Sequence, residues 1–233
     1  MSAHSASHSS SQHRWLFGAN ASLAWLGLSV SLLLTILNTY PVTNTIPTIY
    51  GFNEAGSAGL VGRVLDFFSY FTILSNIVVA VVATMLWRYP NRQSGIFRVL
   101  RLDSLIMISV TGLVFVILLA PKADIQGWAH VSNTLNHYIT PVLTVLVFML
   151  IGPRGLIRVR TIFLALILPL AWVAYSLARG AVIDAYPYGF LDAARYGYGT
   201  VMINLIGIVG IGILLGFVFF GIDRLISKRA LHS

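Results

Sequence analysis

Thr72 and His137 are the residues of this sequence whose types are best suited to chemistry on a carbonyl group. A threonine hydroxyl becomes a nucleophile when a base within hydrogen-bond reach takes its proton. A histidine imidazole titrates near neutrality and often serves as that base. The pair therefore predicts a nucleophile with its base, provided that the fold brings the two side chains together.

Both residues lie on stripes of polar side chains within otherwise apolar sequence. The first stripe consists of Asp66, Ser69, Thr72 and Asn76. The second consists of His130, Asn133, His137, Pro141 and Thr144, with Asn136 and Thr140 beside it. Steps of three and four residues place such side chains on one helix face. Thr72 is then ~9 Å below a helix start at Asp66. His137 is ~12 Å below a start at Ala129, so we expect a similar depth for both.

Neighbouring polar residues are candidates for supporting roles at this site. Asp66, Asn133 or Asn136 would orient the imidazole. Asn76 or Asn133 would donate a hydrogen bond to an oxyanion. Asn204, in the last apolar segment, is predicted at the same level and would line the same pocket. We therefore group these residues as the candidate substrate-binding set.

Other interpretations of the same residues remain open. A threonine in a membrane helix often bonds the carbonyl four residues earlier or packs at a helix contact. Asp66, His130 and His137 would make a metal-dependent hydrolase if they held zinc with a water in the fourth position. His130 and His137 are two helical turns apart, ~10 Å along the axis, which is far for one ion. We therefore expect no metal and no other cofactor.

The composition predicts that these residues lie in a membrane protein. The chain is 57% hydrophobic and only 9% charged, whereas soluble domains carry roughly 25% charged residues. The net charge of +8 would suit nucleic acid, but the basic residues cluster between apolar segments, where membrane topology requires them. Membrane lipids, and not nucleic acid, are the expected partners. The absence of cysteine excludes disulfides and thiolate catalysis.

Six apolar segments have about the length that crosses a bilayer. They lie near Trp15–Thr39, Asp66–Trp87, Arg101–Ala120, Ala129–Ile151, Val159–Ala178 and Tyr198–Ile222. We therefore predict an all-α fold, a polytopic membrane helical bundle of about six transmembrane helices. Residues 14–233 would form this single domain. Residues 1–13 are rich in serine and histidine without an apolar pattern, which predicts a disordered tail.

Basic residues predict the orientation of this bundle. Eleven of the 15 flank one side, namely Arg14, Arg88, Arg92, Arg98, Arg101, Arg154, Arg158, Arg160, Arg224, Lys228 and Arg229. The other four are Arg63, Lys122, Arg179 and Arg195. The richer side is expected in the cytoplasm, together with both termini, in a protein of the cell membrane. Asp103, at that end of the third helix, is expected to pair with a nearby arginine.

Three short motifs lie in the second segment, in the fourth segment and before the last segment. They are Tyr70-Phe71-Thr72 with Asn76, Asn136-His137 shortly before Pro141, and Tyr186-Pro187 before the last helix. Together they resemble the androgen-induced-gene family of six-helix membrane proteins and its bacterial relatives. Eukaryotic members are intramembrane hydrolases of fatty acid esters of hydroxy fatty acids, and they use a threonine and a histidine. The resemblance implies Thr72 as nucleophile and His137 as its partner, and it adds Tyr70 to the substrate-binding candidates.

The sequence thus favours an intramembrane lipid-ester hydrolase whose lipid-like substrate enters from the bilayer. A metal-dependent membrane hydrolase is one alternative. A non-catalytic membrane protein, whether lipid-binding, sensory or transporter-like, is another, because a lipid-binding pocket and an ester-binding pocket can share the same walls. The identity of the substrate and the oligomeric state stay open.

Overall fold

The computed structural model describes residues 13–39, 53, 54 and 56–232. All regular elements in these ranges are helices, and six helices are long and apolar enough to cross a membrane. The six are Arg14–Ile36, Phe71–Arg88, Gly95–Lys122, Ala129–Leu150, Val159–Ile183 and Ala193–Lys228. The predicted class, an all-α membrane helical bundle, is confirmed. The predicted N-terminal tail lies, apart from His13, outside the described residues.

The second span begins later than the polar stripe predicts. Helix α3 (Leu60–Ser69) ends before α4 (Phe71–Arg88) begins. Tyr70 between them is extended, with φ −78° and ψ 133°. The prediction of one helix from Asp66 onward is therefore wrong, and the first polar stripe is divided between two helices.

Two spans contain a π-helical turn. In the third span, successive elements are α5 (Gly95–Val114), the π turn η2 (Phe115–Leu119) and the 3₁₀ turn η3 (Ala120–Lys122). In the fourth span they are α6 (Ala129–Thr134), the π turn η4 (Leu135–Ile139) and α7 (Thr140–Leu150). π turns are rare and frequently occur at functional sites.

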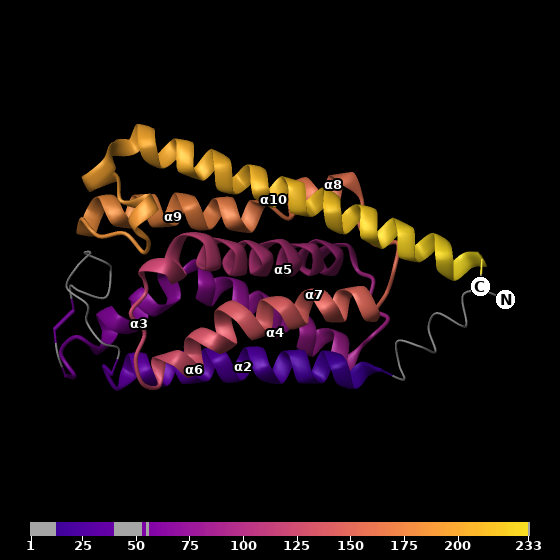
Figure 1. The fold of residues 1–233 in the computed structure, drawn as a ribbon, viewed down its shortest axis with the longest axis horizontal. Coiled ribbons are helices and arrows are strands. Elements are labelled where there is room, and N and C mark those ends of the chain that lie inside the picture. Colours follow the sequence, from indigo (N-terminus) through magenta and orange to yellow (C-terminus); the bar gives the residue numbers. More distant parts are fainter. Residues whose placement is uncertain (1–12, 40–52, 55, 233) are drawn as a thin grey trace.

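The remaining helices form a separate layer. They are α8 (Val159–Leu164), α9 (Ile167–Ile183), the 3₁₀ turn η5 (Gly189–Leu191) and α10 (Ala193–His232). Gly197 interrupts α10 with φ 74° and ψ 153°, a conformation that glycine adopts without strain. In Figure 1, α9 and α10 lie along one side of α5, while α2 (Arg14–Ile36), α4 and α7 lie along its other side. Helix α5 is therefore the centre of the bundle.

The burial of α5 agrees with this central position. Its side chains from Leu102 to Ile108 are all buried. One apolar cluster joins α5 to Ile162 of α8 and Phe219 of α10. A second joins it to Phe17 of α2 and to α4 and α7.

Asp103 does not form the ion pair that its position predicts. Its Oδ1 atom is buried without a hydrogen-bond partner. The one ion pair among the described residues joins Arg179 to Asp66, at the other end of the bundle. The expected Asp103–arginine pair is therefore wrong, because the nearby Arg101 donates instead to the backbone carbonyl of Pro153.

Candidate active site

Thr72 and His137 meet across the bundle. The Oγ1 atom of Thr72 lies 3.1 Å from Nε2 of His137, which is hydrogen-bond distance. Thr72 comes from the first turn of α4, and His137 comes from the middle of the π turn η4. The expected proximity of the two side chains is confirmed.

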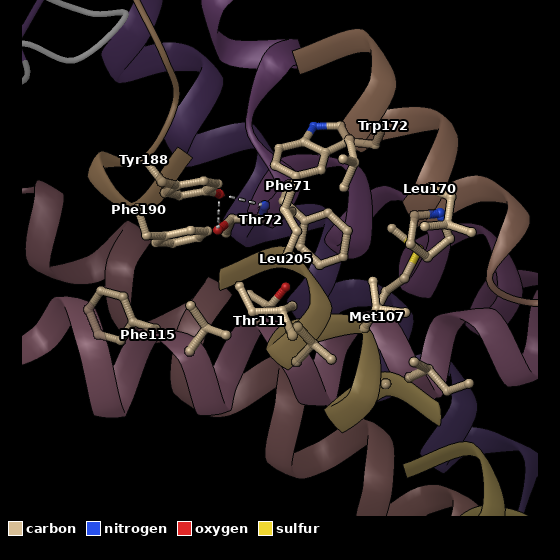
Figure 2. Close-up of a pocket in the computed structure, with 18 of the residues that line it drawn as sticks. Phe71, Thr72, Met107, Thr111, Phe115, Leu170, Trp172, Tyr188, Phe190 and Leu205 are labelled. Carbon is tan, nitrogen blue, oxygen red and sulfur yellow. Dashed lines mark hydrogen bonds between the residues drawn. The ribbon is translucent and has the colours of Figure 1, made fainter. Parts of the chain in front are cut away.

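The break at Tyr70 places Thr72 at a helix N-terminus. No side chain caps α4, and the first N–H groups of a helix have no partner within it. The N–H of Thr72 donates instead to the hydroxyl oxygen of Tyr188, at 3.2 Å. The same hydroxyl lies 3.2 Å from Oγ1 of Thr72. The Tyr188 hydroxyl thus contacts both the hydroxyl and the backbone of Thr72, as Figure 2 shows.

Asn76 holds the backbones around the two candidate catalytic residues together. Pro141 has no N–H, and in the register of the π turn that N–H would bond the carbonyl of Asn136. The amide of Asn76 donates to this carbonyl at 3.2 Å and to the carbonyl of Thr72 at 2.8 Å. The two N–H bonds of Asn76 therefore link α4 to the residue before His137.

The imidazole of His137 is held by stacking. Its ring lies 4.0 Å from the ring of Phe115, with 22° between the planes. Its Nδ1 atom is buried and has no partner among the described residues that meets hydrogen-bond geometry. The backbone carbonyl of Asn133 is the group that lies close to it. The side chain of Asn136 donates to the carbonyl of Gly27 and to Ser31. Phe115, which the sequence analysis missed, therefore orients the ring in place of the predicted carboxylate or amide side chains.

A largely apolar pocket extends from this contact between α4, α5, α9 and α10. Its polar lining residues are Thr72, Thr111, His137 and Tyr188. Its apolar lining includes Phe71, Met107, Leu170, Trp172, Phe190 and Leu205, several of which surround Thr72 in Figure 2. Along the third span the lining includes Phe115 of η2, beside His137, and continues along α5 to Ile106. Nine residues of helix span ~13 Å, so the pocket leads away from the polar pair along the bundle.

None of the six predicted substrate-binding residues belongs to this lining; they are Asp66, Tyr70, Asn76, Asn133, Asn136 and Asn204. Tyr70 packs edge to face against Tyr188, with ring centroids 5.5 Å apart. Asn204 donates to the carbonyl of Phe190 at 3.1 Å. Asp66 bonds Arg179 and Asn53. Tyr70 and Asn204 thus support the aromatic residues of the lining, while Asp66 belongs to a separate polar contact.

The polar contact of Asp66 joins α3 to α9 beside the site. The carboxylate of Asp66 forms an ion pair with Arg179 of α9 and accepts a hydrogen bond from Asn53. Burial raises the pKa of Asp66, and the hydrogen bonds from Arg179 and Asn53 oppose that rise. Nearby, Ser69 lies 2.8 Å from the hydroxyl of Tyr175, which also belongs to α9. An ion pair and a hydrogen bond therefore hold α3 against α9.

We expect Asp66→Asn to lower the free energy of unfolding by about 2 kcal/mol, because it leaves the guanidinium of Arg179 without its carboxylate. Arg179 is 19% exposed, which keeps the cost below that of a fully buried charge. The thermal midpoint of the purified protein in detergent measures the change. Asp124→Asn, which alters an exposed carboxylate bonded to Gln126, is the matched control. Equal midpoints for the two variants would contradict the assignment.

Tyr188 contacts Thr72 and Phe115 contacts His137, and the sequence analysis singled out neither residue. Tyr188 directly follows the Tyr186-Pro187 motif between α9 and α10, and this nearness is the signal that could have identified it. Phe115 lies in an apolar segment, where nothing distinguishes it from its neighbours. Only the stacking contact with His137 reveals it.

Comparisons with known proteins do not assign this chain to a class, so its class follows from the fold and the site. No family model matches the chain, and no curated protein or solved structure is significantly similar to it. No group of three or more histidine, cysteine, aspartate or glutamate residues in the described ranges is placed to hold a metal ion. Six apolar helices around a common core define an integral, multi-pass membrane protein. Its candidate site is a hydroxyl–imidazole contact at a largely apolar pocket.

Proposed function

We propose that this protein is an intramembrane lipid-ester hydrolase with Thr72 as nucleophile and His137 as general base. The observation that carries the proposal is the 3.1 Å contact between Thr72 Oγ1 and His137 Nε2 at the apolar pocket. A nucleophile and a base within hydrogen-bond reach are the minimum for acyl transfer. The resemblance to the androgen-induced-gene family supports the same assignment.

The reaction uses only these side chains, the ester and water. The Thr72 hydroxyl oxygen attacks the carbonyl carbon while its proton passes to Nε2 of His137. The tetrahedral intermediate collapses, the bond to the alcohol oxygen breaks, and that oxygen takes the proton from His137. Water then attacks the acyl-threonine and gives a proton to His137. Release of the carboxylic acid returns that proton to Thr72.

The pocket favours a substrate with a hydrocarbon chain. Lining residues on α5 continue ~13 Å from the level of the site, which is close to the ~15 Å depth of one bilayer leaflet. Its walls are mostly aliphatic and aromatic side chains, against which an acyl chain buries its surface. Because the bundle lies within lipid, such a substrate enters from the bilayer.

Covalent labelling tests this function. The purified full chain in detergent is incubated with an alkyl fluorophosphonate, a probe that phosphonylates activated serine and threonine hydroxyls, and the labelled peptide is identified by mass spectrometry. Labelling at Thr72 together with release of fatty acid from a lipid ester is the expected result. A wild-type protein that is neither labelled nor active contradicts hydrolysis. Retention of a labelled fatty acid by that inactive protein would then favour a lipid-binding role.

The orientation of the bundle is part of the proposal. The excess of lysine and arginine on one side of the bundle favours a cytoplasmic position for both termini and for the end of α7. The site then lies nearer the opposite surface of the cell membrane. Reporter fusions after Arg92, after Arg154 and at the C-terminus are all expected to report a cytoplasmic position. An external C-terminal reporter would contradict this orientation without affecting the catalytic assignment.

A further inference from the structure

Acyl transfer requires hydrogen-bond donors for the negative charge that forms on the ester carbonyl oxygen. The two asparagines predicted for this role are poorly placed. Both N–H bonds of Asn76 are used by the carbonyls of Thr72 and Asn136. Asn133 does not line the pocket. The donors must therefore be other groups beside Thr72.

The hydroxyl of Tyr188 is the polar group that shares this position with Thr72. Its oxygen accepts from the Thr72 N–H at 3.2 Å and lies 3.2 Å from Thr72 Oγ1. When the Thr72 hydroxyl donates to His137, its only proton is used. The proton in the contact between the two hydroxyls then belongs to Tyr188, which donates to Thr72 Oγ1.

The backbone of Thr72 supplies a second donor. Thr72 lies in the first turn of α4, where N–H groups have no helical partner and the helix dipole favours negative charge. The oxygen of Tyr188 occupies the position to which this N–H points. An oxygen atom therefore already lies against the helix N-terminus and next to the nucleophile.

We propose that the Tyr188 hydroxyl and the Thr72 N–H form the oxyanion hole of this site, an inference that rests on the proposed hydrolase function. As the oxygen of Thr72 bonds to the carbonyl carbon, it becomes a poorer acceptor, and the carbonyl oxygen becomes a stronger one. The oxyanion then takes the place of the Tyr188 oxygen against the Thr72 N–H, and the hydrogen bond from Tyr188 passes from Thr72 Oγ1 to the oxyanion. Tyr188 keeps its proton throughout, so the proton balance of the reaction is unchanged.

The ring of Tyr188 is held in place for this role. It stacks on Phe190, with centroids 5.3 Å apart and 2° between the planes, and Tyr70 packs edge to face against it. Figure 2 shows the stacked pair beside Thr72. Burial raises the pKa of Tyr188, and its hydrogen bonds with the side chain and backbone of Thr72 oppose the rise. The hydroxyl therefore stays protonated at neutral pH and remains a donor.

Tyr188→Phe removes the hydroxyl and retains the stacked ring. In the purified full chain, we expect kcat for a lipid ester to fall ~10²-fold with little change in KM. An alkyl boronic acid, which forms a tetrahedral anion on the nucleophile, should bind more weakly by the same factor. A non-reactive alkyl ether of the same chain length should bind as to the wild type. Tyr196→Phe, an equivalent change at an exposed residue outside the pocket lining, is the matched control.

Each other outcome overturns the inference. A kcat within about threefold of the wild type would show that no oxyanion bond was lost. Equal weakening of the boronic acid and the ether would show that Tyr188 only shapes the pocket. A wild-type chain that hydrolyses no ester removes the hydrolase function and the role of Tyr188 with it. Activity in the wild type with an unaffected Tyr188→Phe variant leaves the hydrolase standing and removes Tyr188 alone.

Discussion

Thr72→Ala is expected to lower the hydrolysis of lipid esters by at least ~10³-fold and to abolish labelling by an alkyl fluorophosphonate. The variant lacks the only hydroxyl within hydrogen-bond distance of His137 Nε2 among the described residues. Without it, His137 has no nucleophile to activate other than water. Rates of fatty acid release and the labelled peptide together measure the loss.

Two further variants decide whether this loss is chemical. Thr72→Ser keeps the hydroxyl but frees its rotamer, so we expect activity within about tenfold of the wild type. Thr84→Ala makes the same change on the same helix, ~18 Å away, where the hydroxyl bonds the carbonyl of Ala80. It is expected to keep full activity. Labelling that persists in Thr72→Ala would remove Thr72 as the nucleophile.

His137→Gly is expected to lower hydrolysis by ~10²- to 10⁴-fold, the usual contribution of a general base. The substitution also leaves a space beside the ring of Phe115, against which the imidazole stacks. Added imidazole should occupy that space and restore part of the hydrolysis rate. The restored rate should rise with the imidazole concentration. The fatty acid released per minute in the presence and absence of imidazole measures this rescue.

The double variant and a second histidine provide the controls for His137. Because the nucleophile and its base act as a unit, Thr72→Ala combined with His137→Gly should cost no more than Thr72→Ala alone. His130→Ala, at an exposed residue of α6, is expected to keep full activity. Losses that multiply in the double variant would contradict a shared step. Loss of activity in His130→Ala would instead revive the metal-dependent alternative.

The class of the protein was predictable from the sequence because it depends on composition and segment length. A chain that is 57% apolar must place most of its surface against lipid, and a helix needs ~20 residues to cross the bilayer. The proximity of Thr72 and His137 was predictable for a related reason. Polar side chains are costly in lipid unless they find partners, so the polar residues of two apolar segments tend to meet.

The local geometry at Thr72 was decided by tertiary contacts. No proline or glycine lies between Asp66 and Asn76 to predict a break in the helix. The indole N–H of Trp172 donates to the carbonyl of Ser69 at 2.9 Å, and Tyr175 bonds the Ser69 hydroxyl. These side chains of α9 satisfy the end of α3 from outside the helix, which allows the chain to turn at Tyr70.

The residues that contact Thr72 and His137 were likewise determined by segments far away in the sequence. Tyr188 is 116 residues from Thr72. Phe115, the residue directly after α5, reaches His137 only because the end of α5 and the π turn η4 lie side by side. Gly112 permits this approach, since a Cβ there would lie 3.1 Å from the ring of Pro141. The sequence by itself determined which residue types lie at the depth of the site. The packing of helices far apart in the chain decided which atoms touch, because hydrogen bonds and ring stacking depend on distances that sequence spacing does not specify.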